Sequence, residues 1–429
     1  MKKLHTVYNE KRFRFSSNME FWFCIISLLG FLTTVLCLFF SHGNLFSRIF
    51  FEDILDTGMD FFHSIEYTRG RSPYDYFGTL YPPLANLFFY VLYRFVPIEQ
   101  SSQWKDTFID SVKSRGTSVD LRVWQSTMML YICFIFLSVA ALFLMTQVIL
   151  NRSAKSGLVG LCIVISYGVL YAFERGNIII ISVFCCMFFA AYKDSENKVL
   201  SELSLVMLAI GAGLKIYPAI FGMLLVYDKQ YVKALRTVFY GVFLFVVPVF
   251  AFHEGIGGIS KFINILFSFI DETKITSEGY SFDKILNAIA LLISNVINCE
   301  LSPSFWNPFS SVMKIIVTVF ILIKGFFVKK KWQKILVCAI AFLLYQTQGI
   351  YALTFLSIPL LFMMREEKLC KDTIIPYTAL LFTQIMLPIW ESENSNISII
   401  YLRFQICMLI LSFYILLLKT PSSKRKDQK

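Results

Sequence analysis

Charged residues are scarce in this sequence: Asp, Glu, Lys and Arg make up 16% of the 429 residues, whereas 56% are hydrophobic. A soluble chain of this length needs far more charge to cover its surface, so the composition excludes a protein of two or three soluble domains. It also excludes a disordered chain and a nucleic-acid-binding domain. The 45 Phe, the 21 Tyr and the mean hydropathy of +0.63 instead predict an integral membrane protein.

Cysteine and histidine spacings typical of disulfide scaffolds or zinc sites are also lacking. Eight of the ten cysteines lie within apolar runs, Cys370 lies in a basic break, and Cys299 lies in a long polar stretch. This distribution excludes a disulfide framework and a zinc motif. No set of residues indicates a metal ion, so we expect no metal and no other cofactor.

Basic residues gather in short polar breaks between the apolar runs. More than half of the 40 Lys and Arg residues lie in seven such breaks, which the positive-inside rule places in the cytoplasm. The first 19 residues form a basic N-terminal tail, and residues 419–429 form a basic C-terminal tail. Both termini are therefore predicted to be cytoplasmic. The seven breaks are residues 2–14, 151–156, 193–198, 229–236, 329–334, 365–371 and 419–429.

Thirteen apolar segments are candidate membrane helices, because no short alternating segments indicate a barrel. With both termini on one side, the number of crossings must be even. Segment 81–98 is the one that we predict not to span, because it opens with Tyr81-Pro82-Pro83, contains Arg94, ends at Pro97 and is short. We expect it to be a helix at the outer interface. About twelve transmembrane helices remain, in the ranges 20–252 and 310–418, with extracytoplasmic loops at 41–123 and 253–309.

Four polar side chains near the start of the first loop fall in helical register: Asp53, Asp56, Asp60 and His63. On one continuous helix they would share a face. Clustered carboxylates repel each other, which raises the pKa of at least one, and such a group is a candidate general base for a hydroxyl. A solvated helix face with a capping aspartate is the alternative interpretation.

Two further sites place charge at the membrane edge. Glu174-Arg175-Gly176-Asn177 lies between two apolar segments, where Glu174 and Arg175 either neutralise each other or Arg175 binds a phosphate. Lys215 lies between an apolar segment and Pro218, where it either reaches the headgroups as an anchor or binds an anion. The topology puts both sites on the same outer face as the acidic run. This arrangement suits a substrate with a lipid tail and an anionic head.

Four sequence blocks, in this order, resemble the polyprenyl-phosphate-dependent glycosyltransferases of the GT-C superfamily. They resemble in particular glycosyltransferase family 87 and the catalytic subunit of GPI mannosyltransferase I. The blocks are the acidic start of the loop; Gly70-Arg71-Ser72-Pro73-Tyr74 with Tyr81-Pro82-Pro83-Leu84; Arg175-Gly176-Asn177; and Lys215-Ile216-Tyr217-Pro218. They cover about residues 50–220. One departure is that Gln348-Gly349-Ile350-Tyr351 stands where many family 87 members carry histidine, which concerns the acceptor side or the donor sugar.

The resemblance implies a GT-C-like helical bundle with interfacial helices in the long first loop, and within it a catalytic module at 20–252. It implies transfer of a sugar, such as the hexose mannose, from a polyprenyl phosphate to an acceptor hydroxyl, with inversion. Asp56 is our first choice for the catalytic base and Asp60 the second, and Arg175 and Lys215 are the candidates for the donor phosphate. The expected supporting residues are Asp53, His63, Arg71, Tyr74, Tyr81, Glu174, Asn177 and Tyr217.

The predicted function is therefore that of a hexosyltransferase in the plasma membrane, acting on an envelope glycan, glycolipid or glycoprotein. Its partners are the lipid-linked sugar, the acceptor and membrane lipids, and no nucleic acid. A transporter or a flippase of lipid-linked sugars is the alternative, because carriers also combine many helices with charges at membrane edges. The gathering of charge at one face and the single asymmetric loop favour the enzyme.

Overall fold

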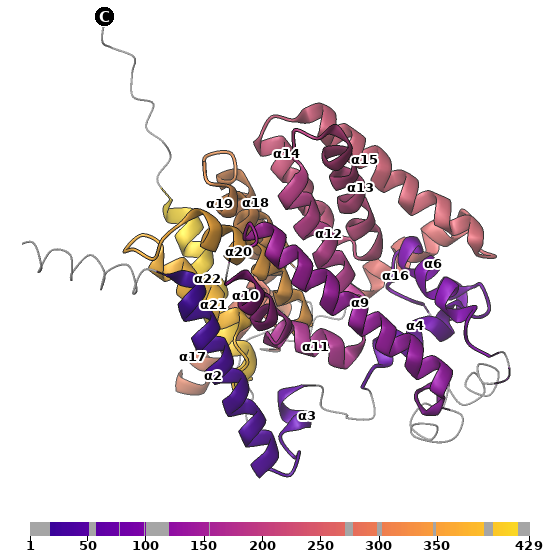
Figure 1. Ribbon diagram of the computed structural model, residues 1–429, viewed down its shortest axis with the longest axis horizontal. Coiled ribbons are helices and arrows are strands. Elements are labelled where there is room, and N and C mark those ends of the chain that lie inside the picture. Colours follow the sequence, from indigo (N-terminus) through magenta and orange to yellow (C-terminus); the bar gives the residue numbers. More distant parts are fainter. Residues whose placement is uncertain are drawn as a thin grey trace, which may run out of the picture.

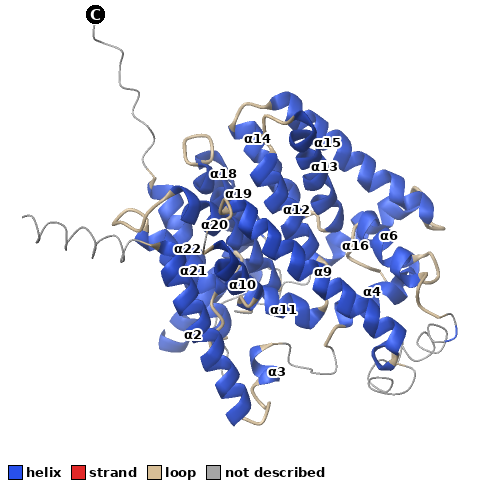
Figure 2. Ribbon diagram, in the orientation of Figure 1, coloured by secondary structure: helices blue, strands red, loops and turns tan. Residues whose placement is uncertain are grey.

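The protein is all-α in the part of the chain that the computed structural model describes (Figures 1 and 2). The all-α architecture predicted from the sequence is confirmed for these residues, whereas the GT-C-like arrangement and the details of the loops stay predictions. The described residues are 18–50, 57–76, 78–97, 99, 120–153, 155–270, 278–297, 303–345, 349–389 and 398–418.

The first part of the chain contains all of the candidate site residues within the described ranges, on helices or in the turns that join them. Its helices are α2 (Met19–Phe40), α3 (Phe46–Ile49), α4 (Met59–Thr68), α5 (Pro73–Tyr76), α6 (Pro83–Tyr93), η2 (Leu121–Val123), α9 (Gln125–Ile149), α10 (Ser156–Val164), α11 (Tyr167–Arg175), α12 (Ile179–Tyr192), α13 (Lys198–Leu214), η3 (Tyr217–Gly222), α14 (Met223–Tyr227), α15 (Tyr231–Val246) and η4 (Val247–Ala251).

The second part packs beside them and contains α16 (Gly257–Ile270), α17 (Phe282–Ile297), α18 (Pro303–Lys324), α19 (Lys331–Tyr345), η5 (Ile350–Leu356), α20 (Ser357–Glu366), α21 (Ile374–Gln384) and α22 (Ile399–Leu417). Figure 1 shows α2 beside the C-terminal helix α21, where the Tyr377 hydroxyl donates to the Met19 carbonyl, so the first described helix packs against the second part of the chain.

Polar side chains mark where several apolar helices begin. The side chains of Asn18, Asn197 and Ser398 accept hydrogen bonds from free backbone N–H groups in the first turns of α2, α13 and α22. Such capping replaces the partners that the first turn of a helix lacks. Pro83 begins α6, where its missing N–H costs nothing. The boundaries of these helices thus follow from local sequence.

Within the described ranges, five helices are long and apolar enough to cross a membrane, and a sixth candidate is the pair α10 and α11, which is bent by 49°. The chain is therefore a multi-pass membrane protein. Other apolar helices, such as Ile179–Tyr192, have only 10–17 residues. The predicted number of twelve spans stays a prediction. The five long helices are Met19–Phe40, Gln125–Ile149, Tyr231–Ala251, Phe305–Lys324 and Ile399–Leu417.

The two long loops predicted outside the membrane contain helices of their own. Segment 81–98 holds α6, whose 11 residues extend about 16 Å, well short of the hydrocarbon core. Segment 253–309 holds α16 and α17, both with one apolar face. The location of these helices at the outer interface remains a prediction.

The core lies around α19 and α20. In α19 all residues from Ile335 to Leu344 are buried, as expected for a helix that is apolar on every side. By contrast, Val232 and Phe239 of α15 are 72% and 66% exposed, which suits a surface that faces lipid. At Gly30 of α2, a Cβ atom would lie 2.5 Å from the carbonyl oxygen of Met386, so glycine permits this close approach of two segments.

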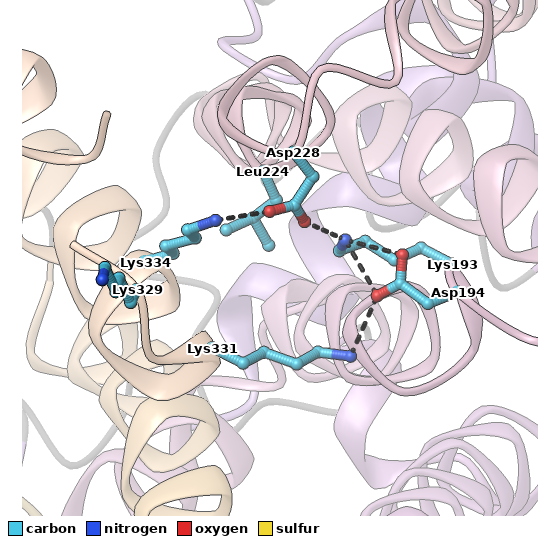
Figure 3. Close-up of a pocket in the computed structure, with 7 residues that line it drawn as sticks. All are labelled: Lys193, Asp194, Leu224, Asp228, Lys329, Lys331 and Lys334. Carbon is cyan, nitrogen blue, oxygen red and sulfur yellow. Dashed lines mark hydrogen bonds and ion pairs between the residues drawn. The ribbon is translucent and has the colours of Figure 1, made fainter. Parts of the chain in front are cut away.

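A network of ion pairs joins the two parts of the chain just after α12. Lys193, which is buried, donates to Asp194 and Asp228, and Asp228 also accepts from Lys334 of α19 (Figure 3). Lys331, which is also in α19, pairs with Asp194. The network therefore ties α12 and α14 to α19.

The surroundings of both carboxylates shift their acidity. Burial raises the pKa of Asp194, but the charge of Lys193 and the hydrogen bonds from Lys193 and Gln230 outweigh burial and lower that pKa to about 2. Burial likewise opposes ionisation of Asp228, yet hydrogen bonds from Lys193 and Lys334 lower its pKa. Both carboxylates are thus stabilised in the ionised form.

Candidate functional site

The acidic run does not form one continuous helix. Gly58 has a left-handed backbone (φ 75°, ψ 1°) and precedes the first residue of α4, Met59. The prediction of one continuous helix through the acidic run is therefore wrong, because the left-handed turn at Gly58 interrupts the helix before Asp60 and His63. Asp53 and Asp56 lie outside the described residues.

Asp60, in the first turn of α4, meets two residues from the end of α11. Arg175 Nη2 donates to Asp60 Oδ1 over 2.7 Å, and Asn177 Nδ2 donates to Asp60 Oδ2 over 2.7 Å. The Arg175 and Asp60 side chains are 15% and 21% exposed, so the pair is only partly open to solvent. Both carboxylate oxygens are thus held by separate donors, which fixes the orientation of the carboxylate.

A glycine turn places these two donors side by side. Gly176 ends α11 in the left-handed region (φ 67°), which allows the chain to turn between Arg175 and Asn177. A Cβ atom at Gly176 would lie 2.7 Å from the Cβ atom of Phe61. The position therefore requires glycine both for its backbone angle and for its close packing against α4.

The turn before α4 is also joined to α11. The Gly58 N–H donates to the backbone carbonyl of Glu174 over 2.7 Å, and Thr57 Oγ1 donates to Glu174 Oε1 over 3.0 Å. Glu174 and Arg175 therefore each contact a residue of segment 57–60. The sequence offered mutual neutralisation of Glu174 and Arg175 or phosphate binding by Arg175, whereas in the structure Glu174 accepts from Thr57 and Arg175 donates to Asp60.

Lys215 follows the last residue of α13 with an extended backbone (φ −144°, ψ 131°). Its Nζ lies 4.2 Å from the centroid of the Tyr81 ring and 5.8 Å from that of Tyr351, so aromatic faces surround the ammonium group. Lys215 and Asp60 also attract each other electrostatically. Asp60, Arg175 and Lys215 accordingly belong to one neighbourhood, although only the first two are directly bonded.

Lys215 lies at an apolar cavity of about 760 Å³. The cavity walls combine residues of η3 with residues of α16, α18 and α19. They also include Tyr351, from the block that differs from many family 87 members. The charge of Lys215 thus borders a space large enough for part of a lipid chain. Apolar residues of the wall include Ile216, Ile220, Leu266, Ile315, Val319, Leu322 and Phe342.

The remaining predicted residues brace this region. Arg71 Nε donates to the Ala251 carbonyl over 2.9 Å, and the Tyr74 N–H donates to Glu254 Oε1 over 3.0 Å, so both residues join the loop after α4 to the chain after α15. Neither contacts the Asp60 carboxylate. Tyr217 stacks on Phe342 with ring centroids 5.0 Å apart, and His63 contacts the ring of Tyr67 at 6.0 Å.

Sequence reasoning missed Thr57 and Tyr131. The Tyr131 hydroxyl, from α9, donates to the Phe173 carbonyl near the end of α11, and its ring lies 5.3 Å from that of Phe61. A tyrosine within an apolar segment is the one indication that the sequence offered, because a buried hydroxyl needs a partner.

Within the described ranges, no three His, Cys, Asp or Glu residues form a group that could hold a metal ion.

The sequence matches the family model described as glycosyltransferase family 87 over residues 79–347. The match covers more than half of the chain and includes Arg175, Asn177 and Lys215, whereas Asp60 precedes it. No curated protein and no solved structure matches the chain.

Proposed function

The chain belongs to glycosyltransferase family 87, and from this premise we propose that it transfers a hexose such as mannose from a polyprenyl phosphate to an acceptor hydroxyl. The acceptor in this proposal is an envelope glycan, glycolipid or glycoprotein. The observation that carries the proposal is the arrangement of a doubly held carboxylate, Asp60, near a cation, Lys215, that borders an apolar cavity.

The cavity supports a donor with a lipid tail. A polyprenyl chain would occupy the apolar walls, and its phosphate would lie at Lys215, the cation that borders them. Arg175 adds a second positive charge beside Asp60. During transfer the phosphate gains charge as it leaves, and fixed cations stabilise that charge more in the transition state than in the ground state.

The proposed reaction is a single displacement. The Asp60 carboxylate accepts the proton of the acceptor hydroxyl, and the hydroxyl oxygen forms a bond to the anomeric carbon. The bond between that carbon and the phosphate oxygen breaks, and the electron pair leaves with the lipid phosphate. Attack opposite to the leaving group inverts the anomeric configuration. Arg175 and Asn177 hold the carboxylate in one orientation for this step.

The reaction face is proposed to be extracytoplasmic. The Asp60 cluster lies at the start of α12, and the Lys193 network lies at its end. The 14 residues of α12 separate the two by about 20 Å, much of the thickness of the hydrocarbon core. Lysines concentrate at the second end, which the positive-inside rule places in the cytoplasm together with both termini. The membrane is proposed to be the plasma membrane.

Transfer by the purified protein tests this proposal. The protein in liposomes is given radiolabelled polyprenyl-phosphate mannose and a lipid extract of its own cells as acceptor. We expect Asp60→Asn and Lys215→Met to lower the rate by about 100-fold or more, because each removes a group that acts in the transition state. Lys261→Met is the control, since Lys261 is 43% exposed and pairs with Asp75 rather than with Asp60.

Asp56→Asn belongs in the same series, because Asp56 was the first choice for the base. Loss of transfer in Asp56→Asn with full transfer in Asp60→Asn would reassign the base. Undiminished transfer in all of these variants would refute the catalytic proposal. Movement of the labelled lipid across the vesicle membrane without a new glycosidic bond would favour the transporter or flippase instead.

A further inference from the structure

An arginine stands within the apolar helix α22. Arg403 is the fifth residue of this candidate span, so it lies about 6 Å along the axis from the first residue of the helix. A charge at that depth is costly unless it is paired or reaches the interface. Arg403 belongs to no ion pair among the described residues, and its Nε and Nη2 atoms are buried there without a hydrogen-bond partner.

The contacts that Arg403 does make leave its hydrogen-bonding capacity unused. Its guanidinium carbon lies 4.3 Å from the centroid of the Phe404 ring and 5.4 Å from that of Tyr167. These rings hold the guanidinium by cation–π contact, but they do not accept conventional hydrogen bonds from its N–H groups. Phosphate and carboxylate are the groups whose oxygens match the planar set of donors of an arginine.

Arg403 also lines a groove of about 440 Å³ between α21 and α22. From Arg403 the groove continues past Ile406 to Ile410, about 10 Å farther along α22 and toward the middle of the helix. Phe382 and Thr378 line it from α21. Charge therefore lies near one end of the span and apolar surface extends inward from it, which is the orientation of a lipid in a membrane.

We propose that this groove binds an anionic phospholipid, whose phosphate accepts hydrogen bonds from Arg403 and whose acyl chain lies along Ile406 and Ile410. The unused donors call for an anion, and the apolar walls call for a chain attached to it. A free phosphate would use the donors but leave the apolar groove unfilled. The groove contains neither Asp60 nor Lys215, so this inference does not rest on the proposed transferase reaction.

Lipid retention by the full-length chain tests the proposal. The protein is purified in detergent micelles that contain phosphatidylglycerol or phosphatidylcholine, and bound lipid is counted by native mass spectrometry. We expect Arg403→Met to weaken retention of phosphatidylglycerol by about tenfold or more, because it removes charge-assisted hydrogen bonds. Retention of phosphatidylcholine should change less. Arg236→Met is the control, since that arginine is 45% exposed on α15.

A second variant keeps the charge and fills the groove. Thr378 is exposed on α21, and Thr378→Trp should displace the acyl chain while Arg403 remains. Thr33→Trp, at an exposed threonine of α2 outside the groove, is its control. Thr378→Trp tests lipid binding in the groove even if Arg403→Met fails to fold.

Three results would overturn the proposal. One is unchanged retention of phosphatidylglycerol in the folded variants. Another is equal retention of both lipids that depends equally on Arg403. The third is displacement of phosphatidylglycerol by inorganic phosphate alone, which would show that the site recognises a free anion rather than a lipid.

Discussion

The Asp60–Arg175 pair makes a quantitative prediction about coupling between α4 and α11. Arg175→Met leaves the Asp60 carboxylate with the hydrogen bond from Asn177, and Asp60→Asn removes the charge that holds Arg175. A hydrogen bond between charged groups contributes about 1.5–3 kcal/mol, and partial exposure places this pair near the middle of that range. We expect a coupling free energy of about 2 kcal/mol, or roughly 30-fold in the unfolding equilibrium.

The measurement is a double-mutant cycle of Asp60→Asn, Arg175→Met and the double variant. Unfolding in mixed micelles is driven by added sodium dodecyl sulfate and followed by the fluorescence of the six tryptophans. The control is a second cycle, Glu202→Gln with Arg236→Met, whose side chains are 36% and 45% exposed. An exposed pair should couple by about 1 kcal/mol or less. The reasoning fails if the coupling free energy from the Asp60–Arg175 cycle is no larger than that from the control cycle.

Three further variants extend the test to other parts of the fold. Gly176→Ala should lower the free energy of unfolding by about 1–3 kcal/mol, because it combines a left-handed backbone with a clash at Phe61. Gly157→Ala in α10, where a Cβ meets nothing within 4 Å, should be neutral or stabilising. Thermal unfolding compares the two variants, and equal effects on stability would contradict this explanation. Because the pKa of Asp194 is about 2 in the folded protein and near 3.9 in the unfolded chain, its stabilising effect is present above about pH 4 and is lost as the pH falls toward 2. Thermal unfolding from pH 5 to pH 3 should therefore show a smaller loss in Asp194→Asn/Asp228→Asn than in the unchanged protein, and parallel losses would refute the assignment.

The sequence predicted the features that depend on local chemistry. The all-α membrane fold followed from long apolar runs, and family 87 membership was indicated by short blocks that include Arg175 and Lys215. The expectation that the first loop and these cations meet at one face agrees with the bond between Asp60 and Arg175. The catalytic roles of these residues stay predictions.

Tertiary geometry decided what the sequence left open. The partner of Arg175 is 115 positions away in the chain, whereas the sequence offered its neighbour Glu174 or a phosphate as the partner. The helical register of the acidic run was wrong, because a glycine in a loop adopts left- and right-handed angles with similar ease and Gly58 takes the left-handed one. The short helices of the bundle also conceal how many segments cross the membrane.

The bond from the Gly58 N–H to the Glu174 carbonyl has an evolutionary consequence. It links the segment before α4 to α11 through main-chain atoms, which every amino acid except proline supplies in full. Relatives that replace the Glu174 side chain can therefore keep the alignment of the Asp60 carboxylate, so long as the turn at Gly58 persists. A substitution at position 174 would change the local charge and remove the hydrogen bond from Thr57, while the main-chain link between the two segments stays in place.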